Sequence, residues 1–327
     1  MDVKLSEIEL LASSGLPEEI PSGYSCVRLT GDASARSYFR VFNDAGKSVC
    51  ILMKMPEPFI EDDFVYLHNY HLFRSAGVPL AEVYLTQPET GNVFLQDLGD
   101  FTFYELYSTW NEQTQLHYFL KSLDYLHQIE KLPPVNSACF NEEKFLWELN
   151  YFRKYFLENL RGIALTEEES QNLQNCFNRL AREISETVSI LAHRDYHSRN
   201  LMVHEDQVYV IDFQDARLGP VTYDLASLCY DSYIQHSPDF RRKLERMFFT
   251  YHPDARIERF EYPRVCLQRN LKALGTFGYQ TTMLGREFYL QFISLTLSYV
   301  KHHFQKLPEY SDLQRILESH IPELRAR

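Results

Sequence analysis

The segment His193–Asn200, with the apolar run that follows it, limits the possible folds of this chain more than any other feature. It reads His-Arg-Asp-Tyr-His-Ser-Arg-Asn, and Asp195 lies five positions before Asn200, which is typical of a loop rather than of one helix face. Directly after this loop the sequence predicts two short strands, residues 201–204 and residues 207–211. Glu205 and Asp206 form the two-residue turn between them, although the Gly or Asn that is usual in such turns is missing.

This predicted hairpin brings two oxygen-bearing side chains together. In the register that the turn implies, Asn200 faces Ile211, so the side chains of Asn200 and Asp212 lie within roughly 5–8 Å of each other. Carboxylate and amide oxygens suit Mg²⁺, which takes water and phosphate oxygens as further ligands. Asp195 is left beside the metal and can accept a proton from a hydroxyl. The pattern predicts phosphoryl transfer, although each residue alone could also be a helix cap, a turn residue or a buried hydrogen-bonding group.

Length and charge exclude some classes of protein. The chain of 327 residues is long enough for one large domain or two ordinary ones, and 45% hydrophobic with 24% charged residues is typical of a soluble protein. A formal net charge of −12 argues against nucleic acid as a partner, because binding to its backbone depends on Lys and Arg. A local lysine and Mg²⁺ can still neutralise the phosphates of a nucleotide.

Cysteine usage and the N-terminus indicate the compartment. The six cysteines are scattered and form no Cys-x-x-Cys pair, which favours reduced thiols over a disulfide framework or a zinc site. The first residues lack the basic region and apolar core of a signal peptide, and no run approaches the roughly 18 apolar residues of a membrane span. We therefore expect a cytoplasmic protein, monomeric or weakly dimeric, with no membrane partner.

The hydrophobic pattern changes type near residues 96–100. Before this point, a helix over residues 1–20 precedes alternating segments that predict a three-stranded meander, one helix and a hairpin: residues 25–29, 37–42, 48–54, 62–75, 83–86 and 92–96. After it, a period near 3.6 predicts helices over residues 106–126, 142–160, 167–184 and from 224 onward. We predict an α+β fold with a small, mainly antiparallel β N-lobe (residues 1–97) and a larger, mostly helical C-lobe (residues 98–327).

The loop and the Asp that follows the hairpin resemble the catalytic loop and metal-binding Asp of kinases. Gln214 stands where protein kinases have Gly, and the segment after it is short, so the chain is closer to the aminoglycoside-phosphotransferase/choline-kinase superfamily. This resemblance implies a protein-kinase-like bilobal fold. It also implies that Asp224 braces the catalytic loop, although its place before a predicted helix makes it a good N-cap as well.

The same resemblance points to residues that bind the nucleotide phosphates. The turn over residues 31–37 occupies the place of the glycine-rich loop, but its single glycine leaves Ser34, Arg36 and Ser37 as the candidate donors. Lys54 ends an apolar strand, where its ammonium group can reach the α- and β-phosphates or snorkel to water. An acid at the next helix start should orient it; Asp63 is favoured by its distance to Gly77, and Glu61 and Asp62 stay open.

More restrictive segments resemble one subgroup, the anomeric N-acetylmuramate/N-acetylglucosamine 1-kinases of cell-wall sugar recycling and their bacterial relatives. These segments are residues 31–41, 94–100, 193–202, 211–216, 219–220, 223–228 and 267–275, and the likeness runs from about residue 25 to residue 300. Gln96 and Asp97, within one of these segments, are expected to bind the cofactor. Three residues near the predicted metal site are expected to contact the substrate: His197, Asp215 and Arg217.

The residues and the resemblance together predict an ATP- and Mg²⁺-dependent kinase of a small-molecule hydroxyl acceptor, with the anomeric hydroxyl of N-acetylmuramate or N-acetylglucosamine as the expected target. Asp195 acts as the base, and His193 and Arg194 shape its loop. The alternatives are a kinase of an aminoglycoside, choline or another amino alcohol, and an inactive nucleotide-binding scaffold. A protein kinase is disfavoured by Gln214 and by the absence of an Ala-Pro-Glu motif.

Overall fold

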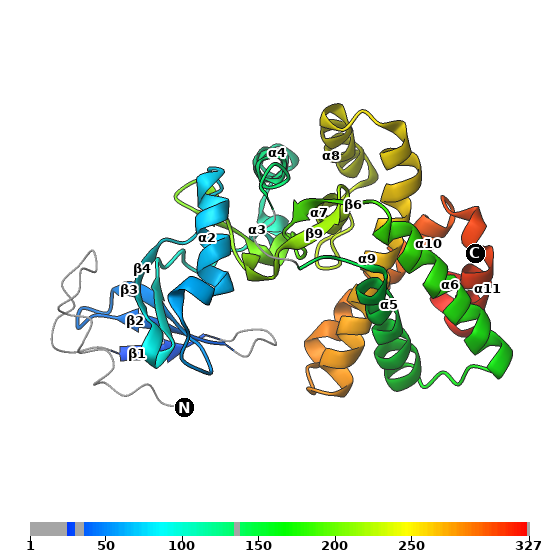
Figure 1. Cartoon of the computed structure of the whole chain (residues 1–327), viewed down its shortest axis with the longest axis horizontal. Helices are drawn as coiled ribbons and strands as arrows, with labels where there is room; N and C mark the ends of the chain where they lie inside the picture. The colour runs from blue at the N-terminus through cyan, green and yellow to red at the C-terminus, as the bar shows by residue number, and fades with distance from the viewer. Residues whose placement is uncertain (1–24, 30–35, 134–137, 326–327) are drawn as a thin grey trace. The chain divides into compact units, whose positions relative to one another are not determined.

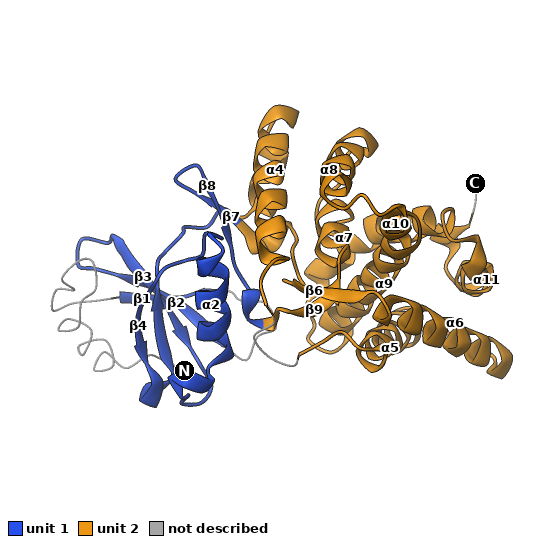
Figure 2. Cartoon of the chain, turned by 45° about the horizontal axis from the view of Figure 1, so that its top comes forward, with its two compact units in different colours: residues 1–101, 202–214 blue, residues 102–201, 215–327 orange. Residues whose placement is uncertain are grey.

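The computed structural model of the chain describes residues 25–29, 36–133 and 138–325. The chain divides into two compact units: unit 1 comprises residues 1–101 and 202–214, and unit 2 comprises residues 102–201 and 215–327 (Figure 2). The sequence placed the change of lobe after residue 97, whereas unit 1 runs to Phe101 and also contains most of the predicted catalytic hairpin. The helix predicted for residues 1–20 lies outside the described residues, as does Ser34.

Unit 1 is built on an antiparallel five-stranded sheet of order β1-β2-β3-β5-β4 (Figure 1). Its strands are β1 (Ser25–Arg28), β2 (Ser37–Phe42), β3 (Ser48–Lys54), β4 (Val83–Gln87) and β5 (Asn92–Leu95). Alternate residues of β2 and β3 point to one face and are buried with Phe94 of β5: Phe39, Val41, Cys50 and Leu52. The alternation in the sequence therefore predicted these strands correctly.

Within the described part of unit 1 the one α-helix is α2 (Val65–Ser75), which buries Tyr66, Tyr70 and Phe73. It begins later than residue 62, where the sequence predicted its start. The acids of residues 61–63 form a 3₁₀ turn, η2 (Glu61–Asp63), and Phe64 then takes an extended backbone with φ −81° and ψ 100°, which interrupts the helix.

The predicted catalytic hairpin is confirmed as β7 (Leu201–His204) paired with β8 (Gln207–Val210). Glu205 and Asp206 connect the strands with φ values of +46° and +62°. Positive φ at both central residues is the signature of the type I′ turn, which matches the twist of a hairpin. The turn therefore forms without the Gly or Asn that normally favours it.

Unit 2 is mainly helical (Figure 1). Its α-helices are α3 (Phe103–Leu106), α4 (Glu112–Ile129), α5 (Glu142–Tyr151), α6 (Glu167–Ser185), α7 (Tyr223–Cys229), α8 (Pro238–Tyr251), α9 (Tyr262–Thr282), α10 (Ile293–Phe304) and α11 (Ser311–His320). Shorter 3₁₀ or π segments join or extend them: η4 (Tyr107–Thr109), η5 (Phe152–Leu160), η6 (Ser198–Asn200), η7 (Phe213–Asp215, which begins in unit 1), η8 (Ile257–Glu261), η9 (Glu287–Phe292), η10 (Pro308–Tyr310) and η11 (Pro322–Leu324).

Two predictions for unit 2 need correction. The helix predicted over residues 106–126 begins at Glu112, because the side chain of Asn111 accepts the N–H of Thr114 at 2.9 Å and caps it there. The antiparallel pair of β6 (Val188–Ala192) and β9 (Arg217–Pro220) was not predicted. These strands are short and distant in sequence, so local periodicity gives them little signal.

Helix α9 packs unusually closely against the π-helical segment η5. A Cβ atom at Gly275 would lie 2.8 Å from the Cα atom of Phe152, and one at Gly278 would lie 2.3 Å from the carbonyl oxygen of Tyr155. Both contacts are with backbone, which side-chain rotation cannot relieve. The two glycines therefore permit this close approach.

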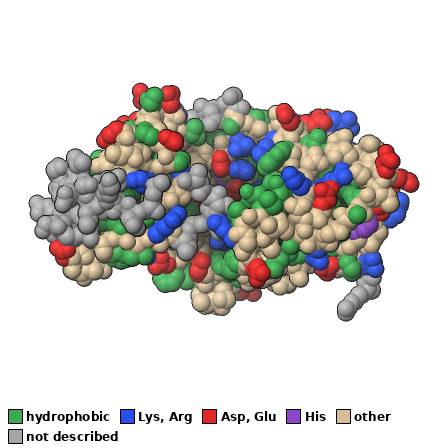
Figure 3. Space-filling view, turned by 90° about the horizontal axis from the view of Figure 1, so that it is seen from below, with side chains coloured by type: hydrophobic (Ala, Val, Ile, Leu, Met, Phe, Trp, Pro, Cys, Tyr) green, Lys and Arg blue, Asp and Glu red, His purple; other side chains and the backbone are tan. Residues whose placement is uncertain are grey.

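Surface and thiol features agree with the composition. On the face shown in Figure 3, acidic and basic side chains are interspersed over unit 2 and form no single basic patch. Within the described residues, no helix has the length and apolar character needed to cross a bilayer. All six cysteines are free, as predicted.

Candidate active site

Unit 1 aligns three polar residues on adjacent strands, of which Lys54 and Ser37 were expected near the phosphates. Lys54 at the end of β3 is opposite Ser37 at the start of β2 and opposite Asn92 at the start of β5. Lys54 is partly buried, while Asn92 is fully buried and receives no mention in the sequence prediction. The structure thus gathers polar side chains at one edge of an otherwise apolar sheet.

Asp212 follows β8 and lies near Arg36, whose guanidinium nitrogen is 3.9 Å from its Oδ1 atom. The Nε2 atom of Gln214 donates to the same oxygen at 2.6 Å. The side chain of Asp212 is 46% exposed, and its backbone has a φ of +64°, which non-glycine residues rarely adopt. Gln214, which replaces the glycine of protein kinases, therefore holds the carboxylate of the predicted metal ligand.

Helix α2 fixes the backbone that follows Asp212. The Nδ2 atom of Asn69, which is almost fully buried, donates to the carbonyl oxygens of Phe213 at 3.1 Å and Gln214 at 3.0 Å. The ring of Phe213 packs against that of Tyr66, with centroids 4.9 Å apart. Sequence reasoning missed Asn69; a lone amide on the apolar face of a helix was the available signal.

The predicted pairing of Lys54 with an acid of residues 61–63 stays a prediction. Asp63 is exposed in the 3₁₀ turn η2, where its backbone N–H donates to the carbonyl oxygen of Ile60. Glu61, an alternative partner, accepts the hydroxyl of Thr86.

Gln96 and Asp97, which were predicted to bind the cofactor, both form hydrogen bonds with other residues of unit 1. The Oε1 atom of Gln96 accepts the N–H of Glu82 at 3.3 Å. The carboxylate of Asp97 pairs with Arg40 at 2.7 Å and accepts the hydroxyl of Ser48. Burial alone would raise the pKa of Asp97, but these contacts hold it below its ordinary value.

In unit 2 the backbone before Asp195 is held by Asp224. The carboxylate of Asp224 accepts the N–H of buried His193 at 2.6 Å and that of Arg194 at 2.9 Å. Arg194 has a φ of +87°, so this bracing maintains a strained backbone beside Asp195. Asp224 lies in the first turn of α7, whose N-cap is Thr222, so the N-cap prediction was wrong and the bracing prediction is confirmed. Burial raises the pKa of Asp224 to about 7.

The end of the loop is held in the same way. Asp231, just after α7, accepts the N–H of Ser198 at 2.7 Å, and burial raises its pKa to about 6. Asn200 donates from Nδ2 to the carbonyl oxygen of Asp195 at 2.9 Å, and its N–H donates to the carbonyl oxygen of His197. The loop around Asp195 is thus fixed by three polar side chains, of which Asp231 was missed.

The carboxylate of Asp195 is surrounded by cations. Its Oδ1 atom lies 2.8 Å from Nζ of Lys272 and 3.3 Å from a guanidinium nitrogen of Arg269, while Nε of Arg194 is 3.8 Å from Oδ2. Burial alone would raise the pKa of Asp195, but these cations, Lys272 foremost, hold it well below its ordinary value. Neither Lys272 nor Arg269 had a predicted role, although two cations three residues apart, on one face of a predicted helix, were a usable signal.

The expected substrate residues lie around this loop. Asp215 accepts a guanidinium N–H of Arg194 at 3.0 Å and lies 3.8 Å from a guanidinium nitrogen of Arg217. The ring of His197 packs edge-to-face on that of Tyr233 at 5.0 Å, and burial lowers the pKa of His197 to about 3. All three expected residues are therefore engaged with protein groups, and their substrate contacts stay a prediction.

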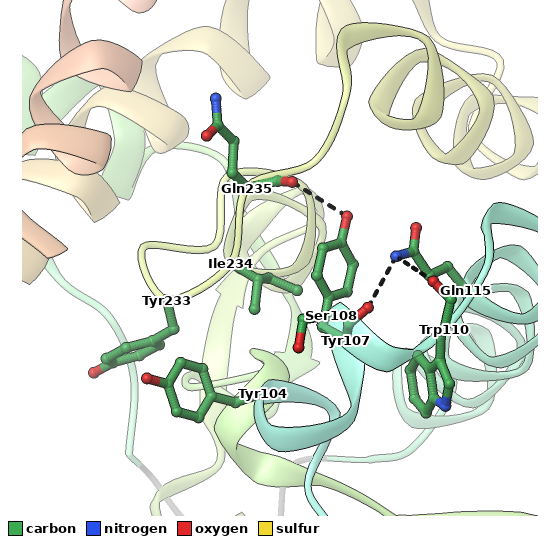
Figure 4. Close-up of a pocket in the computed structure, with 8 residues that line it drawn as sticks. All are labelled: Tyr104, Tyr107, Ser108, Trp110, Gln115, Tyr233, Ile234 and Gln235. Atoms are coloured by element: carbon green, nitrogen blue, oxygen red, sulfur yellow. Dashed lines mark hydrogen bonds between the residues drawn. The ribbon is translucent and has the colours of Figure 1, made fainter.

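A pocket of about 490 Å³ opens beside the loop in unit 2 (Figure 4). Its lining is aromatic with polar tips: Tyr104, Tyr107, Ser108, Trp110, Gln115, Tyr233, Ile234 and Gln235. The guanidinium carbon of Arg199, next to Asn200 in sequence, lies 5.0 Å from the ring centre of Tyr233 and 6.0 Å from that of Tyr104. Because Tyr233 also contacts His197, the pocket and the catalytic loop share a wall.

A further cluster of His and Glu lies apart from these residues. Glu130, at the end of α4, has one carboxylate oxygen 3.4 Å from Nδ1 of His127 and 2.9 Å from Nε2 of His252. Sequence spacing gave no sign of this cluster. Because both imidazoles already reach the same carboxylate oxygen, we interpret it as a structural link between the C-terminal ends of α4 and α8.

Comparison with protein families agrees with this loop and hairpin. The model of the phosphotransferase enzyme family matches residues 25–260. The chain belongs to this family. Relatives named N-acetylmuramate/N-acetylglucosamine kinase include one from Pseudomonas aeruginosa, 28% identical with 97% of each chain covered, and one from Pseudomonas putida, 26% identical with 91% of this chain and 89% of the other covered. This phosphotransferase is thus an enzyme that transfers phosphate to a hydroxyl acceptor.

Solved structures confirm the protein-kinase-like fold. The gentamicin complex of APH(2″)-IIa gives a TM-score of 0.60 at 14% identity, with 91% of the phosphotransferase and 96% of the other chain covered. An amicoumacin kinase in complex with AMP-PNP and Ca²⁺ gives 0.55 at 14% identity, with 90% and 93% covered. At such identities the likeness shows the fold alone.

Proposed function

We propose that this phosphotransferase transfers the γ-phosphate of ATP to the anomeric hydroxyl of N-acetylmuramate or N-acetylglucosamine. The observation that carries the proposal is the fixed loop around Asp195, in a chain whose named relatives act on these two sugars. The pocket beside the loop supports a sugar acceptor, because aromatic faces and hydroxyl or amide groups bind the apolar and polar faces of a hexose.

The proposed phosphate contacts come from unit 1, where Lys54 fixes the α- and β-phosphates and Arg36 and Ser37 add donors. We assign Mg²⁺ to the amide oxygen of Asn200 and the carboxylate of Asp212. The donor set fits this ion: Nδ2 of Asn200 is committed to a carbonyl oxygen, so Oδ1 remains as an acceptor, and the carboxylate of Asp212 is a hard oxygen ligand. The ion would neutralise charge along the phosphates.

In the proposed step the acceptor oxygen forms a bond to the γ-phosphorus while the bond from phosphorus to the β-phosphate oxygen breaks, and ADP leaves. The hydroxyl proton passes to Asp195, whose loop is held by Asp224, Asp231 and Asn200. Because little covalent chemistry falls to the protein in such transfers, positioning and charge stabilisation supply most of the rate enhancement.

The test measures ADP release with each sugar and locates the phosphate by phosphorus NMR. We expect a phosphate on the anomeric carbon of both sugars, and no reaction with the corresponding 1-O-methyl glycosides, which lack the reacting hydroxyl. Phosphorylation of a methyl glycoside, or preference for an aminoglycoside or choline, would contradict the assigned acceptor.

A further inference from the structure

Two cations of α9 converge on one oxygen of the proposed base. Lys272 and Arg269 are three residues apart, so they lie on the same face of the helix, and both reach Oδ1 of Asp195. The guanidinium carbon of Arg269 also lies 5.1 Å from the ring centre of Tyr223, which helps to hold it in place. This pair is not needed to hold the loop, because Asp224, Asp231 and Asn200 already bind its backbone.

The position of Lys272 has a direct chemical consequence. Any hydroxyl that donates a hydrogen bond to Oδ1 of Asp195 comes close to an ammonium group 2.8 Å from that oxygen. When the proton moves to the carboxylate, negative charge develops on the acceptor oxygen and the cation loses its partner at the same moment. An ammonium group in a largely buried site stabilises such charge more strongly than one in water.

We propose that Lys272, supported by Arg269, is a catalytic residue that stabilises the negative charge on the acceptor oxygen and makes the site selective for neutral or anionic acceptors with an acidic hydroxyl. This inference rests on the proposed function and extends it. An anomeric hydroxyl is more acidic than an ordinary alcohol, so it suits a base that is weak but well placed. A cationic amino alcohol would be repelled by Lys272, Arg269 and Arg194 around the base.

The ion pairs at Asp195 agree with separate roles for Asp195 as the base and Lys272 as the group that stabilises charge on the acceptor oxygen. The cations favour the ionised form of Asp195, which accepts a hydrogen bond from the acceptor hydroxyl. Burial lowers the pKa of Lys272 and Arg269 adds to this effect, whereas Asp195 opposes it. The charges of Lys272 and Asp195 are therefore coupled.

The test compares Lys272→Met and Lys272→Arg with wild type, using N-acetylmuramate and N-acetylglucosamine as separate acceptors. We expect Lys272→Met to lose kcat by about 10²-fold or more with both sugars, the loss typical when one donor to a developing oxyanion is removed. Lys272→Arg, which keeps the charge, should recover part of this loss. Lys301→Met is the matched control, since the ammonium group of Lys301 donates to the carbonyl oxygen of Arg325.

The split between kcat and KM separates a catalytic role from a structural one. We expect Lys272→Met to lower kcat while KM for MgATP stays near that of wild type, because Lys272 acts on the acceptor oxygen and not on the nucleotide. Binding of MgATP, measured by calorimetry, should remain in both variants and shows that the protein is folded.

A pair of acceptors that differ in charge tests the selectivity. Glucosamine has the same anomeric hydroxyl as N-acetylglucosamine but carries an ammonium group at neutral and lower pH. Wild type should prefer N-acetylglucosamine, and this preference should narrow in Lys272→Met because one repelling cation is gone. A preference that is unchanged in the variant contradicts the charge argument.

Two further outcomes would overturn the inference. A loss confined to N-acetylmuramate would show that Lys272 binds the carboxylate of that sugar instead of the acceptor oxygen. Near-normal kcat in Lys272→Met with both sugars would remove the residue from catalysis. If the wild-type enzyme itself phosphorylates neither sugar, the proposed function is wrong, and this result is independent of the role of Lys272.

Discussion

In unit 1 the carboxylate of Asp212 is 46% exposed and Arg36 lies 3.9 Å away, whereas in unit 2 the carboxylate of Asp195 is 21% exposed, with Lys272 at 2.8 Å and Arg269 at 3.3 Å. The first carboxylate is accessible and accepts a hydrogen bond from the uncharged amide of Gln214, whereas the second is surrounded by cations. Phosphates and a divalent ion bring their own charge and can organise an accessible carboxylate. The reacting hydroxyl brings none, so the protein must organise the acceptor side itself.

The largest effect should come from the carboxylate that is surrounded by cations. Asp195→Asn keeps the shape of the side chain but cannot accept the proton, so we expect turnover to fall about 10³-fold. Affinity for MgATP, measured by calorimetry, should stay close to that of wild type. Asp124→Asn, an exposed acid on α4, is the matched control. An Asp195→Asn enzyme that keeps most of its turnover would place the base elsewhere.

Buried groups of unit 2 make its stability depend on pH between 7 and 5, in two opposite senses. Asp224 and Asp231, with pKa values raised to about 7 and about 6, bind protons in the folded protein and stabilise it as the pH falls, whereas two buried histidines destabilise it. Burial lowers the pKa of His197 and of His236 to about 3, below the 6.5 of a free imidazole. Neutral imidazoles therefore stabilise the fold above pH 6.5, and this stability is lost as the pH falls toward 3. Lowering the pH from 7 to 5 should therefore reduce the free energy of unfolding by about 2 kcal/mol for each of these histidines.

Hydrogen exchange at several pH values measures this difference unit by unit. In unit 1 the lowered pKa of Asp97 stabilises the fold above its ordinary value of 3.8, and that stability is lost only below this pH. Amides of α7 and α8 should thus change their protection between pH 7 and pH 5, while those of the five-stranded sheet keep theirs. His236→Gln removes one destabilising group, so its unit 2 should be more stable at pH 5, relative to pH 7, than that of wild type by about 2 kcal/mol. Equal sensitivity of both units to acid would contradict the contrast.

For the accessible carboxylate of Asp212 we expect a smaller effect, and one that depends on the metal. Asp212→Asn removes one anionic ligand of Mg²⁺, so affinity for MgATP should fall about tenfold or more. Affinity for ATP in the presence of a chelator should change little. Asp44→Asn, in the exposed turn between β2 and β3, serves as the control. Equal losses with and without Mg²⁺ would assign Asp212 a role other than metal binding.

The smallest expected effect separates two roles of Asp97. If its contacts with Arg40 and Ser48 are its main role, Asp97→Asn should lower the unfolding free energy by about 1 kcal/mol and leave ATP affinity unchanged. Thermal unfolding and calorimetry measure the two quantities on the same sample. Weaker ATP binding at unchanged stability would instead support the cofactor role expected from the sequence.

The sequence predicted the parts of the site whose geometry is local. Asp195, Asn200 and Asp212 lie within eighteen residues of one another, and the hairpin between Asn200 and Asp212 is set by a two-residue turn. Alternation likewise predicted β2 and β3, because one face of these strands is buried. Local patterns were sufficient for these elements, because the contacts that define them are also local.

Contacts between distant segments were the ones that local patterns could not give. Lys272 is 77 residues from Asp195, and Asp231 is 33 residues from Ser198, so neither spacing indicates a contact. The positive φ of Arg194 could not be predicted either, because arginine does not favour it. Strain of this kind is maintained by surrounding contacts, such as those of Asp224 with the loop backbone.

The close packing of α9 against η5 makes turnover sensitive to positions that no acceptor would touch. Gly278 lies less than two turns after Lys272 on the same rigid helix. A methyl group at Gly278 would push the helix away from Tyr155 and carry the ammonium group of Lys272 with it. Random mutagenesis followed by a screen for altered turnover should therefore yield substitutions along the contact between α9 and η5. Evolution could change the rate of this enzyme by shifting one helix while every catalytic side chain stays the same.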